Sequence, residues 1–424
     1  SFGQARDQSI IALDELDLDA EAVERIDQLF SALMYPYRGL RRPAEMLAKN
    51  RKGQPGLWAY GISGDYPILL LRIEEEEQLP RVRELLRAHT YWRDRQLKID
   101  LVILNERDVG YAQELTNQLN QVITQMDSES WLNRRGGIFL LRADQMDEAN
   151  RVLLQTAARV VLDANAGPLA DQVDRLLEGP SRLPAFAPPG VEKEPTPISP
   201  VARPDDLLFD NGFGGFSSDG REYVVYLDTA SEAHRSENWT PAPWINVVAN
   251  STFGFLVSET GLGYTWAGNS GENRLTPWRN DPVSDTPAEA LYLRDEETGG
   301  IWSPTPLPAG EDCPYLVRHG PGYSLFQHHS HGLKQRLRVF AAAEAPVKVI
   351  KLSLENAQDR QRRLTATFFA EWVLGTHRDQ AQQYVVSEYH AETGALLARN
   401  AYNPEFGDRV AFAAASAEPH GLTA

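Results

Sequence analysis

The apolar positions in the first part of the chain alternate between helical and strand periods. Two continuous apolar runs, at 66–73 and 99–105, are typical of strands that are buried on both faces. A helical pattern at 79–96 separates them, so the order predicts a right-handed parallel βαβ unit. A further helix is expected at 19–34, with five apolar residues on one face: Ala22, Ile26, Leu29, Phe30 and Leu33.

The same alternation continues as far as residue 177. Helical patterns occupy 109–125 and 147–154, and strand patterns occupy 137–141 and 157–163. We therefore expect residues 1–177 to form a three-layer α/β domain with a helical start.

After residue 204 the pattern changes to many short β segments. Gly, Asn, Asp and Pro separate these segments, as they do in antiparallel sandwiches. We therefore expect an all-β antiparallel sandwich over 205–424. Its strands are expected at 223–228, 244–249, 254–258, 291–295, 333–341, 347–354, 364–373 and 383–390.

Eight prolines among the 27 residues 178–204 mark the boundary between the two patterns. Proline lacks a backbone N–H and has a fixed φ, so this composition favours extended polyproline geometry over helix or central strand. We interpret the segment as a linker or as an arm lying on a neighbour. A proline-rich docking motif is the alternative.

The segment 264–285, YTWAGNSGENRLTPWRNDPVSD, is both polar and aromatic and shows no helical or strand period. Tryptophan offers a flat face for a sugar ring, while Asn, Arg, Asp and Glu offer directional hydrogen bonds to hydroxyls. The segment is therefore a candidate carbohydrate-facing loop; a long connection pinned by its own side chains is the alternative. The candidate carbohydrate-binding residues are Trp266, Asn269, Glu272, Asn273, Arg274, Trp278, Asn280 and Asp281.

Charge and composition narrow the classes of partner. The formal net charge of −17 and the pI near 5.0 argue against nucleic acid or an anionic membrane as a partner. No run of about 18 apolar residues is present, so we expect no membrane contact by this segment. The single cysteine, Cys313, excludes an internal disulfide and is typical of a reducing compartment such as the cytoplasm. The chain opens at Ser1 without a signal peptide, as an excised piece of a longer polypeptide would.

Three other motifs suggest chemistry, but each has a simpler structural interpretation. The glycine-rich segments 61–65 and 211–220 lack the features of phosphate-binding loops. We expect the first to be a structural turn and the second to start a hairpin or to contact another domain. His328, His329 and His331 could offer metal ligands, but no cysteine or nearby acid completes a set. We interpret them as surface or interface histidines, and we expect neither a metal nor a cofactor.

Hydrolytic cleavage of a glycoside would need two carboxyl groups on either side of the scissile bond. Glu272, Asp281 and Asp285 are close in sequence, but closeness in sequence does not establish that separation. Glu371 lies on an expected strand, where pairing with an arginine is the simpler interpretation. We therefore expect no catalytic residue in this chain.

Longer motifs resemble a known family. LLFDNGFGGFSSDGREYVVYL and TPAPWINVVANSTFGFLVSETGLGYTWAGNSGENRLTPWRNDPVSD are similar to the N-terminal sandwich of glycoside hydrolase family 94. GLWAYGISGDYPILLLRI and RELLRAHTYWRDRQLKIDLVILNE resemble the region just upstream of that sandwich in the cyclic β-1,2-glucan synthetases of this family. The resemblance extends from about residue 29 to residue 424.

The resemblance implies a galactose-mutarotase-like supersandwich. Family members continue into a helical linker and an (α/α)6 barrel, which carries the general-acid aspartate. No position of this chain matches that motif, so the resemblance implies a non-catalytic portion that ends before the sandwich is complete. It also implies a parent glycosyltransferase or glycoside phosphorylase, anchored in the bacterial inner membrane, that handles β-1,2-glucan.

Three functional hypotheses follow. The first is binding of a β-glucan or oligosaccharide together with support for the barrel of the parent chain. The second is a purely structural scaffold that mediates homodimerisation and places the polar loop against protein. The third is a free-standing hydrolase or lyase that uses Glu272 and Asp281, for which we expect no turnover.

Overall fold

The computed structural model describes residues 13, 16–35, 37–108, 110–174, 198–228, 239–281 and 286–423. The chain divides into two compact units, one of residues 1–183 with 383–424 and one of residues 184–382. Most of the proline-rich segment 178–204 lies outside the described residues, so its interpretation as a linker stays a prediction.

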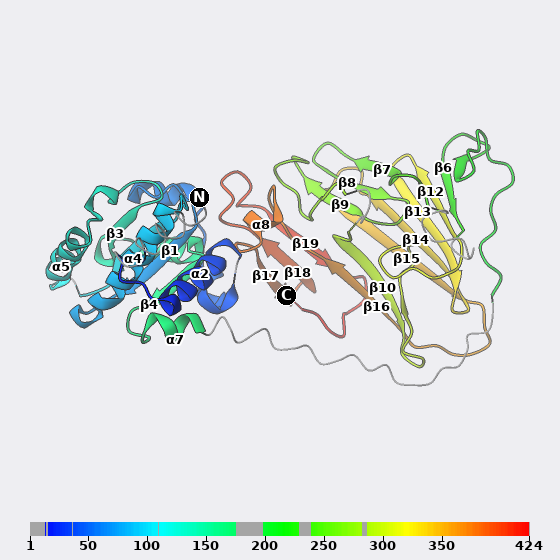
Figure 1. The fold of residues 1–424 in the computed structure, drawn as a ribbon. Helices are drawn as coiled ribbons and strands as arrows, with labels where there is room; N and C mark the ends of the chain where they lie inside the picture. The colour runs from blue at the N-terminus through cyan, green and yellow to red at the C-terminus, as the bar shows by residue number, and fades with distance from the viewer. Residues whose placement is uncertain are drawn as a thin grey trace, which may run out of the picture. The chain divides into compact units, whose positions relative to one another are not determined.

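The first unit is built from a parallel sheet and the helices between its strands. In chain order its elements are α2 (Ala20–Met34), η1 (Arg38–Leu40), α3 (Ala44–Leu47), η2 (Gln54–Tyr60), β1 (Ile68–Ile73), η3 (Glu76–Gln78), α4 (Leu79–Asp94), β2 (Asp100–Asn105), α5 (Ala112–Gln125), η4 (Glu129–Trp131), β3 (Ile138–Arg142), η5 (Ala143–Gln145), α6 (Glu148–Ala157), β4 (Val160–Asp163) and α7 (Leu169–Asp174). The strand order is β3-β2-β1-β4, and every pairing is parallel. Figure 1 labels β1, β3 and β4 of this sheet. The predicted α/β class is therefore confirmed.

Hydrophobic cores cover both faces of this sheet. Successive strand residues point to opposite faces, so Leu69 and Leu71 join one core while Ile68 and Leu70 join the other. Helices α2, α4 and α5 pack into the first core and α6 packs into the second. Strand β2 is buried along its whole length, as its continuous apolar run predicts.

Residues 383–424 return to the first unit. They form the antiparallel sheet β17-β18-β19, with β17 at Val386–His390, β18 at Ala395–Arg399 and β19 at Val410–Ala414. Tyr402 joins the core beside α6 and stacks on Tyr384 with ring centroids 3.9 Å apart. The sequence pattern did not indicate this return. The predicted domain limits, 1–177 and 205–424, stay a prediction.

The second unit consists of antiparallel sheets. Its elements are β5 (Gly214–Phe216), β6 (Tyr223–Leu227), β7 (Ile245–Ala249), β8 (Phe253–Ser258), β9 (Gly263–Ala267), β10 (Glu289–Asp295), β11 (Ile301–Trp302), β12 (Tyr315–Gly320), β13 (Tyr323–Ser330), β14 (Leu333–Ala341), β15 (Lys348–Asn356), β16 (Leu364–Ala370) and α8 (Arg378–Ala381). They form the sheets β15-β14-β13-β12-β6-β5, β7-β8-β9 and β11-β10-β16. All pairings between these strands are antiparallel, as predicted.

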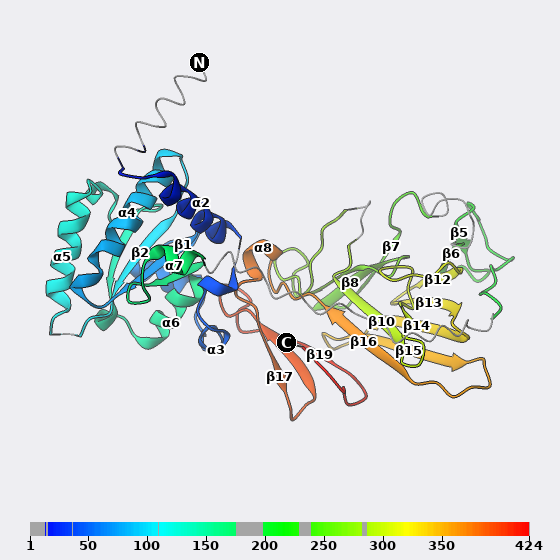
Figure 2. The ribbon, with the colours of Figure 1, turned by 60° about the horizontal axis from the view of Figure 1, so that its bottom comes forward.

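A single core joins two of these sheets face to face. Phe255 and Val257 of β8 pack with Tyr315, Phe326 and Leu337 of the six-stranded sheet. The two sheets are thus the layers of a sandwich (Figure 2). On the opposite face of the three-stranded sheet, Ile245 and Val247 of β7 are exposed, whereas Leu256 of β8 and Tyr264 of β9 are each only 7% exposed.

Candidate functional site

The candidate segment begins as a strand. Tyr264 to Ala267 belong to β9, where Tyr264 lies opposite Leu256 and Trp266 lies opposite Gly254 of β8. The expectation of a segment without strand period is therefore wrong for these four residues. Tyr264 and Trp266 alternate with Thr265, which points to the opposite face of the sheet, beside Glu289.

Tyr264 is the centre of an aromatic cluster. Its ring centroid lies 5.2 Å from that of Trp266 and 5.3 Å from that of Trp278, at interplanar angles of 38° and 27°. Tyr264 is only 7% exposed, whereas both tryptophans are half-buried. We call these three residues the aromatic cluster. It brings together two predicted site residues that are twelve positions apart, and it leaves part of each indole accessible.

The asparagines of the segment hold its backbone. Asn269 Oδ1 accepts hydrogen bonds from the backbone N–H groups of Gly271 (2.8 Å) and Glu272 (3.0 Å). Asn273 is 3% exposed, and its Nδ2 donates to the carbonyl of Ala267 at 2.7 Å. These bonds satisfy the groups of a tight turn, so the turn is pre-organised rather than loose.

Two further side chains connect the turn to its surroundings. Arg274 Nε donates to the carbonyl of Ser270 (3.3 Å), and the guanidinium carbon lies 5.8 Å from the centroid of the Tyr264 ring. Glu272 accepts a hydrogen bond from the Thr376 hydroxyl (2.9 Å). The structure thus gathers Trp266, Arg274 and Trp278 around Tyr264, with Glu272 directed towards residue 376.

The remaining predicted site residues lie at the exposed end of the segment. Asn280 is exposed and has a φ of 51°, a left-handed conformation that asparagine tolerates better than most residues. Asp281 is exposed as well. Residues 282–285, including Asp285, lie outside the described residues.

A buried ion pair below the aromatic cluster was not predicted. Glu289 Oε1 accepts from the hydroxyls of Thr265 (2.6 Å) and Thr276 (2.8 Å), and Lys348 Nζ donates to Oε2 at 2.7 Å. Burial opposes ionisation of Glu289, but Lys348 and the two threonine hydroxyls outweigh it and lower the pKa of this carboxyl. Glu289 is therefore a fixed anion that braces β9. Its partners are far apart in sequence, so no local pattern indicates them.

Three described carboxyl groups in or near the segment each have a partner other than a second carboxyl group. Glu272 is bonded to Thr376, and Glu371 forms an ion pair with Arg378. The expectation that Glu371 pairs with an arginine is confirmed. Glu289 is tied to Lys348. None of these arrangements supplies two carboxyls facing one another across a cleft.

The three histidines have separate partners, and the interpretation as surface or interface residues is wrong for His328, which is fully buried. His328 stacks on Tyr315 with centroids 3.8 Å apart, and His329 Nδ1 lies 2.9 Å from the carbonyl oxygen of Ser199. His331 stacks on Trp302 and places Nε2 2.7 Å from Glu311 Oε2. Across the described residues no group of three His, Cys, Asp or Glu side chains could hold a metal.

The glycine-rich segments are structural where they are described. Gly61 and Gly64 have φ values of 75° and 77°, which place them in turns. Gly214 lies in β5, where a Cβ would approach the carbonyl oxygen of Val224 in β6 to 2.0 Å. The second segment therefore starts a hairpin, as one of its two interpretations predicted.

The fold and these motifs agree with comparisons to known proteins. A model of the glycosyl hydrolase 94 supersandwich domain matches residues 222–424. This part of the chain is a family 94 supersandwich. The match confirms the resemblance drawn from the motifs, and the supersandwich contains all eight predicted carbohydrate-binding residues.

Relatives with named activities extend the comparison. The cyclic beta-(1,2)-glucan synthase NdvB of Rhizobium meliloti is 34% identical over 430 residues, which are 98% of this chain and 15% of that protein. The N,N'-diacetylchitobiose phosphorylase of Vibrio furnissii is 30% identical over 184 residues, 43% of this chain and 22% of that enzyme. The solabiose phosphorylase of Paenibacillus borealis is 29% identical over 224 residues, 50% of this chain and 27% of that enzyme.

These relatives are much longer than the chain, which spans less than a third of each. The match to the glucan synthase includes the α/β unit, whereas the phosphorylase matches cover half of the chain or less. Among the described helices, none has the length and apolar character needed to cross a lipid bilayer.

Proposed function

We propose that this chain contributes carbohydrate binding, and support for a catalytic barrel, to a larger family 94 protein that processes β-glucan. The observation that carries the proposal is the aromatic cluster, in which two tryptophans flank the buried Tyr264 of β9 and remain partly exposed. In this proposal a sugar ring stacks on an indole face, and Arg274, Asn280 and Asp281 bond its hydroxyls.

Pre-organisation supports this role. The turn is held by Asn269, Asn273 and the Glu272–Thr376 bond, so little conformational entropy is lost when a ligand binds. Stacking and a few hydrogen bonds on an open surface correspond to weak binding, with a dissociation constant on the order of millimolar, or about 4 kcal/mol. The catalytic step would belong to the barrel of the parent protein.

Isothermal titration of the 424-residue chain with linear β-1,2-gluco-oligosaccharides tests the proposal. We expect a saturable heat at millimolar ligand that is lost in Trp278→Ala. Trp58→Ala is the matched control, because Trp58 is an exposed tryptophan of the other unit. Absence of heat with the folded chain, or equal loss in both variants, would contradict binding at the aromatic cluster.

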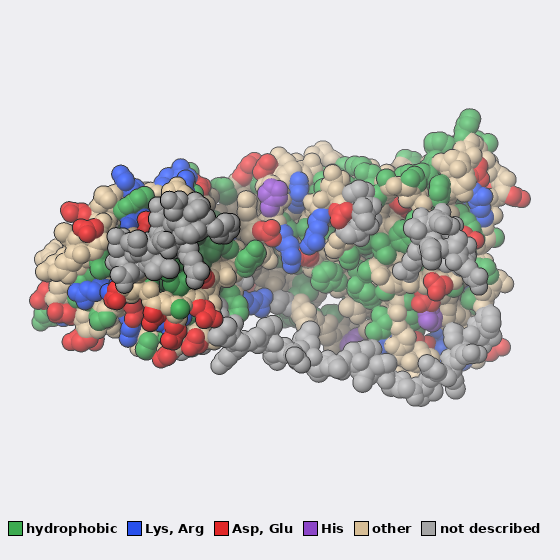
Figure 3. Space-filling view, in the orientation of Figure 1, with side chains coloured by type: hydrophobic (Ala, Val, Ile, Leu, Met, Phe, Trp, Pro, Cys, Tyr) green, Lys and Arg blue, Asp and Glu red, His purple; other side chains and the backbone are tan. Residues whose placement is uncertain are grey.

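A scaffold is the second candidate, because an apolar surface adjoins the site. Ile245 and Val247 of β7 are 45% and 57% exposed, and Figure 3 shows hydrophobic side chains over β7 and β8. A scaffold that dimerises through this face would elute as a dimer and become monomeric in Val247→Glu. Light scattering coupled to gel filtration separates the two candidates, since the binding proposal requires no dimer. We expect no cleavage or phosphorolysis of β-glucosides by the chain alone.

A further inference from the structure

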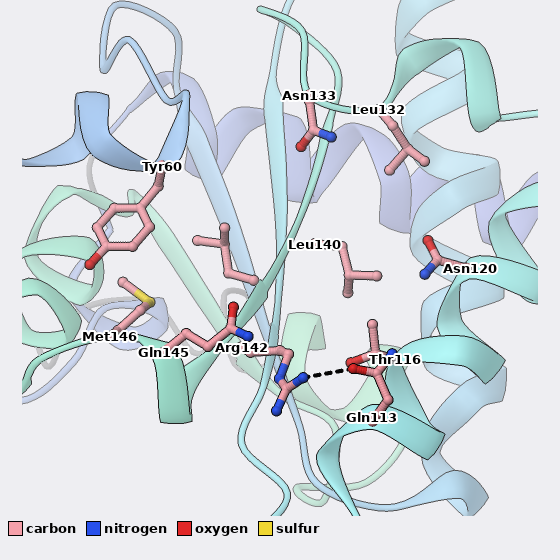
Figure 4. Close-up of a pocket in the computed structure, with 11 residues that line it drawn as sticks. Tyr60, Gln113, Thr116, Asn120, Leu132, Asn133, Leu140, Arg142, Gln145 and Met146 are labelled. Carbon is pink, nitrogen blue, oxygen red and sulfur yellow. Dashed lines mark hydrogen bonds between the residues drawn. The ribbon is translucent and has the colours of Figure 1, made fainter. Parts of the chain in front are cut away.

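A cavity of about 320 Å³ opens along the outer edge of β3 in the α/β unit. Figure 4 shows Gln113, Thr116 and Asn120 of α5 on one side of the strand, and Tyr60 and Met146 on the other. The volume is at the lower end of the range of small-ligand sites, roughly 300–1,000 Å³. The cavity is therefore large enough for a compact ligand.

The edge of β3 supplies polar backbone groups to the floor of this cavity. The Ile138 carbonyl accepts from the Asn133 N–H on the outer edge of the strand, at 2.9 Å. Backbone groups of alternate strand residues point to the same edge, so Leu140 also directs its N–H and C=O outward. Of the described strands only β2 pairs with β3, on the other edge. A donor and an acceptor of Leu140 therefore face the cavity.

Neutral amides form the rim. The side chains of Asn120, Asn133 and Gln145 line the cavity, and none of them makes a hydrogen bond to another described residue. Each offers a donor and an acceptor to a ligand. Leu140 packs against the core on one face of the sheet and Leu141 against the core on the other, so the two side chains add apolar surface on both sides of the strand. The lining thus combines amide groups with two flanking apolar patches.

The ends of the cavity limit the class of ligand. Arg142 donates to Gln113 Oε1 of α5 (2.8 Å) and to both carboxylate oxygens of Asp144 (3.0 and 2.6 Å). This bridge obstructs one end of the strand edge, and Asn133, bonded to Ile138, obstructs the other. A peptide that adds as a further strand needs an edge open at its ends. The Asp144 carboxylate compensates the guanidinium charge, which disfavours a phosphate.

We infer that this cavity binds a neutral polyhydroxylated ligand, one or two sugar residues in size. Its hydroxyls bond the amides of Asn120, Asn133 and Gln145 and the backbone groups of Leu140, while the less polar ring face contacts Leu140 or Leu141. The site lies on a different unit from the aromatic cluster, so it can be present whether or not that cluster binds glucan.

Hydrogen-exchange mass spectrometry on the 424-residue chain tests this inference. The probes are glucose, the β-1,2-linked disaccharide of glucose and inorganic phosphate, each at a concentration on the order of 10 mM. We expect both sugars to slow exchange in peptides covering 112–125 and 132–146. Phosphate should leave these peptides unchanged.

The double variant Asn120→Ala/Gln145→Ala should weaken this protection by about tenfold in ligand concentration, because two hydrogen-bonding side chains are lost. Gln121→Ala is the matched control, since Gln121 is exposed on α5 but does not line the cavity. Trp278→Ala should remove the protection from hydrogen exchange that the sugars give to peptides covering 253–281, and should leave that of 132–146 unchanged. This result would distinguish binding in the cavity from binding at the aromatic cluster. The inference is wrong if neither sugar protects 132–146, if phosphate alone does, or if the double variant keeps full protection.

Discussion

The indole of Trp266 lies so close to Gly254 of the neighbouring strand that a Cβ on that glycine would come within 2.4 Å of a ring carbon. The two residues are direct partners in the β8–β9 register. The missing side chain of Gly254 therefore provides the space in which Trp266 contacts Tyr264. A glycine in one strand thus fixes the position of an aromatic residue in the next.

Replacing Gly254 with alanine should displace Trp266. We expect Gly254→Ala to lower the free energy of unfolding by about 1–3 kcal/mol, as overpacking does, and to change tryptophan fluorescence. Urea denaturation measures the first effect. Gly271→Ala is the control in the same segment, because the nearest atom to its added Cβ, Asn269 Oδ1, is at an ordinary contact distance of 3.4 Å. Equal stability of Gly254→Ala and the native chain would show that the indole can move without cost.

The Glu289–Lys348 pair should stabilise the sandwich only as a pair. Both side chains are largely buried, so Glu289→Gln leaves an uncompensated lysine and is expected to cost about 3 kcal/mol. Lys348→Met should cost a similar amount. The double variant should be more stable than the sum of the two losses predicts, because neither buried charge remains. A double-mutant cycle by urea denaturation measures this coupling; strictly additive losses would contradict it.

Asn273 should act through its amide donor. Asn273→Asp keeps the shape of the side chain but puts a carboxylate oxygen against the Ala267 carbonyl, which now accepts from Nδ2. We expect a loss of about 2 kcal/mol in stability, since a buried acceptor would lose its donor. Asn280→Asp, at an exposed position, is the control and should leave the melting temperature unchanged. A similar effect of both variants would point to charge rather than to the hydrogen bond.

Two histidines, the buried His328 and the partly exposed His319, should make the second unit sensitive to acid. Burial lowers the pKa of His319 and of His328 to about 4, from an ordinary value of 6.5. Between pH 6.5 and 4 the unfolded chain therefore binds protons that the folded unit does not. Each histidine then removes up to about 1.4 kcal/mol of stability per pH unit as the pH falls through this window.

Urea denaturation at pH 7, 6 and 5 measures this dependence. The double variant His319→Gln/His328→Gln should show a flatter fall in stability with decreasing pH than the native chain. His390→Gln is the control, because His390 belongs to the other unit. Parallel pH profiles of the double variant and the native chain would exclude these two histidines as the cause.

Much of the architecture follows from local patterns. The apolar run 66–73 predicted β1, and the helical period of 79–96 predicted α4, because burial on one or both faces leaves a periodic signal. The sequence pattern did not predict strands β12 and β13. His319, His328 and Gly320 interrupt their apolar pattern. His328 is nevertheless fully buried, with Nδ1 3.1 Å from the Pro314 carbonyl oxygen, and the partly exposed His319 has Nδ1 2.8 Å from the Ser324 hydroxyl. Polar residues that make tertiary hydrogen bonds thus break the apolar pattern by which a strand could be predicted from its sequence.

The sequence indicated which residues belong to the candidate site, but not how they contact one another in the fold. The sequence indicates Trp266 and Trp278 as candidate binding residues. It does not indicate that Tyr264 lies between their rings in the fold. From the sequence, Asn269 and Asn273 are candidates either to bond sugar hydroxyls or to brace the loop, and in the structure their side chains bond backbone groups of the turn. Lys348 and Thr265 are far apart in sequence and lie in different sheets. Their contact below the aromatic cluster depends on how the two sheets pack, which no local pattern predicts.

The most direct test of carbohydrate binding at the aromatic cluster is fluorine NMR of the chain labelled with 5-fluorotryptophan. The sequence contains nine tryptophans, and Trp266→Phe and Trp278→Phe assign the two signals of interest. With linear β-1,2-gluco-oligosaccharide, we expect these two signals to shift together and saturate at ligand concentrations on the order of millimolar, while the Trp58 signal stays unchanged. Unchanged Trp266 and Trp278 signals at saturating ligand would contradict the account.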